Sequence, residues 1–157
     1  MSKIEKTDLI NTNNISTKYG LIAGGLMAVA LFLFQVTGND FSPFLKLSKY
    51  ILLALSIVIA LNIYKDKIKG NIFFNGLAVG TKLSFIAGLL LVVINFLLFF
   101  TFPSVAFSKY GIEPSSLKQV TMISGVLFFE SLVFGSLITF AVLQYLKDGG
   151  EVKEDKS

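Results

Sequence analysis

The stretch VTMISGVLFFESLVFGSLITFAVLQYL, Val120–Leu146, decides the fold class. It is 27 residues long and carries one formal charge, Glu130. At about 1.5 Å per helical residue, a helix of this length crosses a bilayer core of roughly 30 Å with some tilt. Three further long apolar stretches precede it, and none of them contains an acid.

The sequence therefore predicts an all-α membrane protein, a bundle of four transmembrane helices in a single domain. Hydrophobic residues make up 54% of the chain, and the mean hydropathy is +0.73. In an average soluble domain the apolar residues are dispersed, whereas here they form four blocks. The predicted spans are about 19–36, 48–64, 77–102 and 120–146.

Lysine placement predicts the orientation. All 14 basic residues are Lys. With Lys82 of the third span set aside, nine of them lie in the N-tail, in the loop after the second span and in the C-tail, against four in the other two loops. The positive-inside rule then places both termini in the cytoplasm. Residues 1–18 are interpreted as a cytoplasmic N-tail and residues 147–157 as a cytoplasmic C-tail, disordered after the stop signal Gly149-Gly150.

The composition excludes several function classes. The chain has neither Cys nor His. This removes disulfides, thiolate or imidazole metal sites and histidine catalysis, so we expect no enzyme, no catalytic residues, no metal and no cofactor. The net charge of +4 is explained by topology, and nucleic-acid binding is not expected.

Small residues recur at helical spacing in three of the spans, and such residues let helix backbones approach closely. They predict helix-packing positions rather than a substrate-lining face. These positions are Gly20 and Gly24 in the first span, Gly76, Gly80, Ser84 and Gly88 in the third, and Ser131 and Gly135 in the fourth.

Glu130 needs a partner because a carboxyl group inside a membrane must be neutral, paired or in contact with water. It lies seven residues, or roughly 10 Å, after Ile123, near which we place the outer edge of the membrane core. The same depth matches Asn95 in the third span and Leu55 or Ser56 in the second. We therefore predict an intramembrane polar cluster of Glu130, Asn95 and Ser56, in which a protonated Glu130 donates a hydrogen bond to Asn95.

The helical faces complicate this pairing. Ser124, Ser131 and Gly135 share one face of the fourth span, and Glu130 lies more than 90° from its centre. The Glu130 face must be covered either by another helix of this chain or by a second chain. In the second case the partner is another copy of this chain or a subunit of a membrane complex, bound through this face. The lipid bilayer is the other expected partner.

Three interpretations of Glu130 follow: a hydrogen-bonded structural carboxyl, a protonation-linked role in transport, or a contact with lipid or a small ligand. The first predicts a non-enzymatic structural or accessory subunit of a membrane complex or homo-oligomer. The alternative is a small proton-linked transporter that uses Glu130. No span contains a proline, and the Gly24-Gly25 pair is the one plausible helix break of the kind found in transporters.

Two stretches carry a family resemblance: KYGLIAGGLMAVALFLF and YKDKIKGNIFFNGLAVGTKLSFIAGLLLVV. They resemble the four-span family known as domain of unknown function 4199, which is abundant in Bacteroidota. Tyr19-Gly20, the Lys-rich turn from Lys67 to Gly70, Phe74 and Gly80 match its pattern. The resemblance extends over most of the chain. It implies a four-span topology and a location in the bacterial inner membrane, and it supplies no activity.

Overall fold

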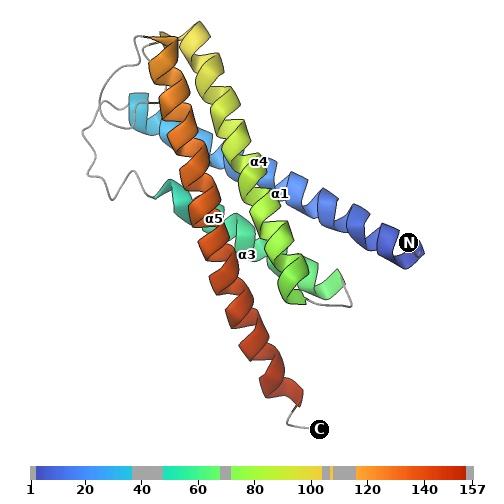
Figure 1. Ribbon diagram of the computed structural model, residues 1–157. Coiled ribbons are helices and arrows are strands. Elements are labelled where there is room, and N and C mark those ends of the chain that lie inside the picture. The colour runs from blue at the N-terminus through green and yellow to red at the C-terminus, as the bar shows by residue number, and fades with distance from the viewer. Residues whose placement is uncertain (1–2, 37–47, 68–71, 104–106, 108–115, 155–157) are drawn as a thin grey trace.

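The described residues form an all-α structure. The computed structural model describes residues 3–36, 48–67, 72–103, 107 and 116–154. Within these ranges the chain forms four helices, drawn in Figure 1: α1 (Lys3–Val36), α3 (Lys49–Lys67), α4 (Ile72–Thr101) and α5 (Leu117–Glu154). The predicted helical fold class is confirmed.

Three of these helices are long and apolar enough to cross a membrane. The candidate spans are Asn13–Val36, Phe73–Thr101 and Leu117–Leu146. Their mean hydropathies, from 1.9 to 2.7, indicate a multi-pass membrane protein. Helix α3 is shorter, since Lys49 and Lys65 leave an uncharged stretch of 15 residues, Tyr50–Tyr64. That stretch is about 22 Å long, less than a bilayer core of roughly 30 Å.

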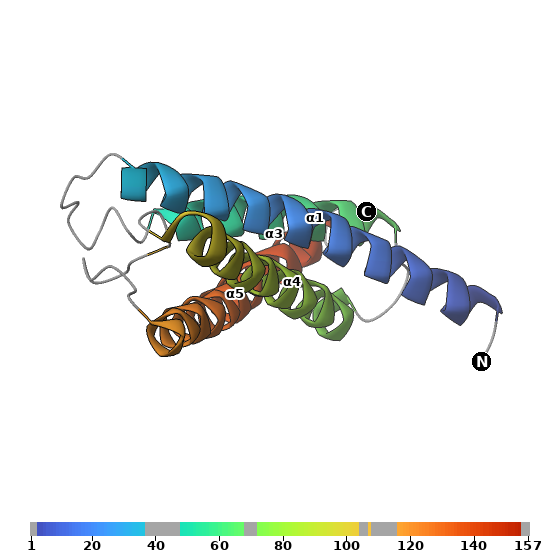
Figure 2. The same cartoon turned by 90° about the horizontal axis from the view of Figure 1, so that it is seen from above.

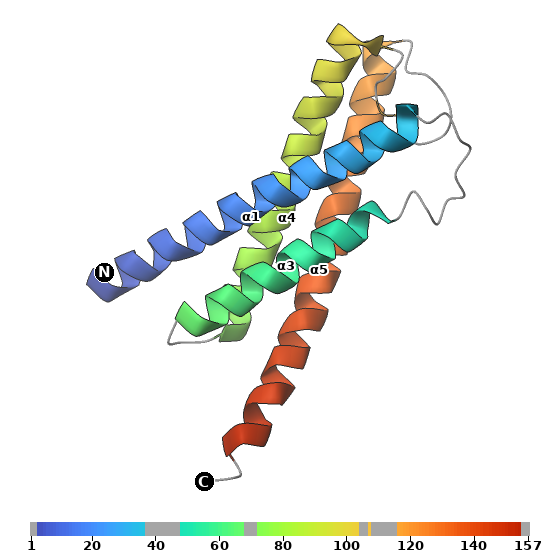
Figure 3. The same ribbon diagram turned by 180° about the vertical axis from the view of Figure 1, so that it is seen from behind.

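The helices form two crossed layers. Helices α1 and α3 lie side by side in one layer, and α4 and α5 lie side by side in the other, as the views from above and from behind show (Figures 2 and 3). Helix α1 also packs along α4, and α3 contacts both helices of the second layer. The N-terminal end of α1 and the C-terminal end of α5 lie toward the same end of the bundle (Figure 3).

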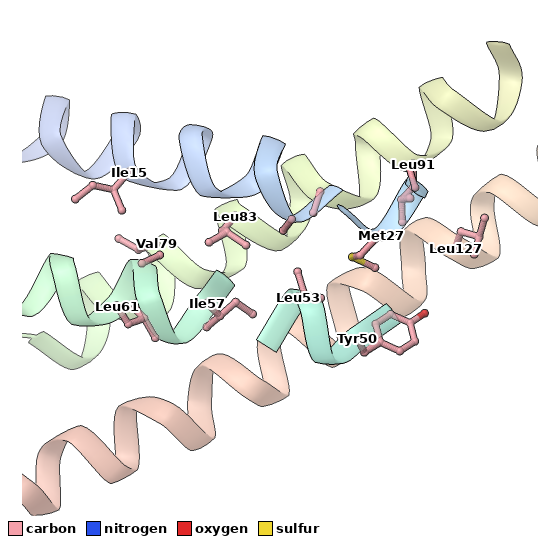
Figure 4. Packing of buried hydrophobic residues seen from close by; sticks show 14 of the residues in the cluster. Ile15, Met27, Tyr50, Leu53, Ile57, Leu61, Val79, Leu83, Leu91 and Leu127 are labelled. Atoms are coloured by element: carbon pink, nitrogen blue, oxygen red, sulfur yellow. The ribbon is translucent and has the colours of Figure 1, made fainter. Parts of the chain in front are cut away.

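The core lies between the two layers. Figure 4 shows Leu53, Ile57 and Leu61 of α3 pointing toward the other helices, and all three are almost fully buried. Met27 of α1 and Leu91 of α4 belong to the same cluster. In a bilayer the lipid tails are as apolar as these side chains, so close packing holds such helices together more than hydrophobic burial does.

Small residues provide that close packing. On the face between α1 and α4, Gly20 lies against Leu83 and Ile86, and Gly24 lies against Ala87. A methyl group at either glycine would collide with the backbone of α4. The interface between α4 and α5 contains four small-residue contacts: Gly76 with Leu143, Gly80 with Thr139, Ser84 with Gly135, and Gly88 with Ser131. We call this row the α4–α5 seam.

Helices extend beyond the predicted spans at both ends of the described chain. Helix α1 begins at Lys3, so the segment read as an N-tail is helical. Helix α5 continues through Gly149-Gly150 to Glu154, which corrects the disorder predicted for most of 147–157. Each glycine costs a helix only about 1 kcal/mol relative to Ala. Extending an existing helix adds one hydrogen bond per residue, so propagation tolerates that cost.

Candidate functional site

Glu130 lies near the middle of the longest apolar segment. It is 13 residues after Leu117 and 16 residues before Leu146, which bound the candidate span of α5. The first residues of α3 meet α5 at this level, so the start of one helix contacts the centre of another. Figure 4 shows Tyr50 at the beginning of α3, directed toward α5.

Two consecutive residues of α3 reach the same oxygen of Glu130. The Tyr50 hydroxyl donates a hydrogen bond to Glu130 Oε2 at 2.6 Å. Lys49 Nζ lies 3.7 Å from that oxygen. The ammonium group is also 5.0 Å from the centroid of the Tyr50 ring, within the range of a cation–π interaction. We call Lys49, Tyr50 and Glu130 the α3–α5 cluster.

Phe134 supports the cluster from α5. Its ring stacks on Tyr50 with a centroid separation of 4.5 Å and an interplanar angle of 24°. Phe134 follows Glu130 by four residues, so both side chains project from one face of the helix. The phenol is thus fixed at its ring by stacking and at its hydroxyl by the carboxyl group.

Burial is uneven within the cluster. The Lys49 side chain is 3% exposed, whereas that of Glu130 is 19% exposed. An enclosed cation needs a compensating charge, and Glu130 supplies one. The carboxyl group therefore has two roles: it neutralises Lys49, and it remains partly open at the edge of the bundle.

The predicted hydrogen bond between Glu130 and Asn95 is corrected. Asn95 is fully buried, and its amide Nδ2 donates to Ser124 Oγ at 2.8 Å. Its Oδ1 accepts the backbone N–H of Phe107 at 2.9 Å. The cause is the direction of the side chains: Asn95 projects toward the small-residue face of α5, where Ser124 lies, and Glu130 projects away from that face. Asn95 instead joins α4, α5 and the chain segment between them.

Ser56 also stands apart from Glu130. Its hydroxyl donates to the carbonyl of Leu52, one turn earlier in α3, at 2.9 Å. The three residues predicted as one cluster therefore occupy three separate hydrogen-bonding sites. At Oε2, Glu130 accepts the Tyr50 hydroxyl and lies beside a lysine, so this oxygen is paired.

The axial position of α3 explains why Lys49 was not predicted as a partner. A second span that begins at the outer edge of the membrane with Ser48 has Lys49 near the surface and Ser56 level with Glu130. In the structure Lys49 itself is level with Glu130. One signal was available in the sequence: the uncharged stretch after Lys49 is too short to start at the same edge as the other spans.

Lys82 follows a different pattern. It lies within the candidate span of α4, and its Nζ donates to Asn13 Oδ1 of α1 at 2.5 Å. Its side chain is exposed and reaches toward the N-terminal part of α1, as expected of a lysine that extends to the headgroups. Among the described residues, no group of three or more His, Cys, Asp or Glu side chains is placed to hold a metal ion.

Comparisons with protein-family models, with curated proteins and with solved structures found no match to this chain.

Proposed function

We propose that the chain is a four-span protein of the bacterial inner membrane with both termini in the cytoplasm. In this proposal α3 crosses the membrane in addition to the three candidate spans in α1, α4 and α5. The outward face of α3 supports this topology. Ile51, Leu55 and Ile59 are 48–62% exposed and form an apolar stripe suited to lipid. The lysine distribution and the resemblance to domain of unknown function 4199 agree with the same arrangement.

Within that topology we infer a non-enzymatic structural or accessory role, as a homo-oligomer or as a subunit of a membrane complex. The observation that carries it is the α3–α5 cluster. Lys49 and Tyr50 bind Glu130 inside the chain and fasten a short helix to the centre of a long one. Loss of one partner from an enclosed charge pair is strongly destabilising, so such a pair favours one fixed packing of the two helices.

The Glu130 side of α5 is the surface to test for a second copy. Leu137 follows Glu130 by seven residues, shares its face and is 62% exposed. Phe129, equally exposed at 67%, lies about 100° around the helix and serves as a matched control. Because the chain has no cysteine, a single Cys at either position gives an unambiguous disulfide.

In native membranes under mild oxidation, Leu137→Cys is expected to form cross-linked dimers and Phe129→Cys is not. If both variants remain single chains, the homo-oligomer is excluded. The accessory role then requires a stoichiometric foreign partner on purification in mild detergent. Purification of the chain alone would exclude that role as well.

A proton-linked transporter is the second candidate, because the α3–α5 cluster lies near the centre of the α5 span. Ionisable groups at that depth often mark ion pathways. Proteoliposomes containing the protein should then show proton or solute flux that Glu130→Gln abolishes and Glu130→Asp partly retains. Flux that is unchanged in Glu130→Gln would exclude a transport role for this residue.

A further inference from the structure

We propose that Glu130 is a reversible proton-binding site, and that proton uptake there releases the first turn of α3 from α5. The inference goes beyond the accessory role and does not depend on transport. It rests on three features of the α3–α5 cluster. One carboxylate oxygen makes both contacts, the lysine is the enclosed partner, and the cluster lies at the start of α3.

One oxygen serves both contacts. Glu130 Oε2 accepts the Tyr50 hydroxyl and lies 3.7 Å from Lys49 Nζ. A proton added to the carboxyl group removes the negative charge that strengthens the hydrogen bond and attracts the ammonium group. One protonation event therefore weakens both of these contacts between α3 and α5, and the stacking of Tyr50 on Phe134 remains.

The two charges differ in their access to the surroundings. Glu130 is 19% exposed and can exchange a proton, whereas Lys49 is enclosed at 3%. Once Glu130 is neutral, the enclosed ammonium loses the compensation that this carboxylate supplies, which is unfavourable for a buried charge. A lysine can relieve this by extending its head toward water or headgroups. Lys49 can do so when the first turn of α3 moves away from α5.

The position of the cluster on α3 localises the movement. Lys49 and Tyr50 are the first two residues of the helix. The following turns are held by the core, where Leu53 and Ile57 are completely buried. Release at the cluster therefore frees the beginning of α3 and leaves its packed part in place.

Other titratable groups around the cluster are few in the described part of the chain. Helix α3 contributes Lys49 and Tyr50. Lys82, the one titratable side chain described on α4, is bonded to Asn13. On α1, Lys18 and Tyr19 interact with each other, at a ring distance of 5.9 Å. On α5 the nearest are Lys118 and Tyr145, more than three turns from Glu130. Glu130 is thus the group in this set that acidification neutralises.

The test is a distance between spin labels in the full-length, cysteine-free chain. The labelled pair is Ile51→Cys on α3 and Phe129→Cys on α5, both at exposed positions. A control pair, Leu21→Cys on α1 and Phe85→Cys on α4, is also exposed and reports on two packed helices that should keep their distance from each other. Both pairs are measured in lipid nanodiscs in alkaline and in acidic buffer, with and without Glu130→Gln.

We expect acidification to lengthen the Ile51–Phe129 distance by on the order of 5 Å, about one helical turn. The Glu130→Gln chain should show the longer distance in both buffers, and the control pair should not change. A distance that is independent of pH and unchanged by Glu130→Gln would mean that the cluster is a permanent structural link. A pH response that persists in Glu130→Gln would assign the effect to another group. Either result overturns the inference.

A second measurement needs no Glu130 variant. Dicyclohexylcarbodiimide reacts with protonated carboxyl groups in apolar surroundings, so the fraction of labelled Glu130 peptide should rise on acidification. Absence of labelling in acidic buffer would overturn proton uptake at Glu130. A pH-dependent distance without flux would support the inference and exclude the transporter. Flux that depends on Glu130 while α3 stays fixed would support the transporter and overturn the proposed release of α3.

Discussion

Lys49 and Tyr50 occupy consecutive positions at the start of α3, and both contact the same oxygen of Glu130. The sequence alone identified Glu130 as the residue that needs a partner, because a carboxyl group inside a membrane is costly whatever surrounds it. It did not identify the partner. That depends on how far α3 is displaced along α5, a property of packing between distant segments, which local residue patterns do not encode.

Asn95 is the second polar residue whose role the structure defines. Asn95→Ala removes two hydrogen bonds and leaves the buried Phe107 N–H without this acceptor. We expect a loss of about 1–2 kcal/mol in the free energy of unfolding. Asn62→Ala, at an exposed position on α3, is the matched control and should change stability little. Unfolding by SDS in mixed micelles measures both, and equal losses would argue against the buried network.

At the scale of elements, the α4–α5 seam is the part that the sequence predicted well. Small residues at intervals of four in 76–88 share one helix face, and that information is local. In the structure these residues lie against α5, and Ser131 and Gly135 form part of the opposing surface. The ends of the helices were less predictable, because the extension of α1 and α5 past the apolar segments depends on helix propagation and not on hydropathy.

Two glycines of α5 allow a direct comparison. A Cβ at Gly135 would collide with Ser84 across the seam, whereas one at Gly125 would meet nothing within 4 Å. Gly135→Ala should therefore destabilise the protein by about 1–3 kcal/mol through overpacking. Gly125→Ala should be neutral, or stabilising by up to about 1 kcal/mol, because alanine favours helix. Thermal unfolding in detergent measures both, and equal effects would contradict the seam.

For the whole molecule, composition and apolar length were sufficient to predict a helical membrane protein. The number of membrane crossings is harder to predict from the sequence, because the 15-residue uncharged stretch of α3 is short for a span. Its contacts with α1, α4 and α5 and its exposed apolar face support a membrane location. This arrangement allows the charged start of α3 to lie level with the middle of α5.

Topology reporters fused to each terminus test the number of crossings. Four spans place both termini in the cytoplasm, so a reporter that is active only in the cytoplasm should be active at both ends. A chain in which α3 did not cross would have three spans and its termini on opposite sides. An active reporter at one end and an inactive one at the other would contradict the four-span proposal.

The central claim is that Lys49 and Glu130 form a charge pair inside one chain, and exchanging the two charges tests it most directly. Lys49→Glu and Glu130→Lys should each lower the free energy of unfolding by about 3–5 kcal/mol, because each places like charges together. The double variant restores an opposite-charge pair and should recover at least about 1 kcal/mol relative to the sum of the two losses. A double variant as unstable as that sum would contradict the pair.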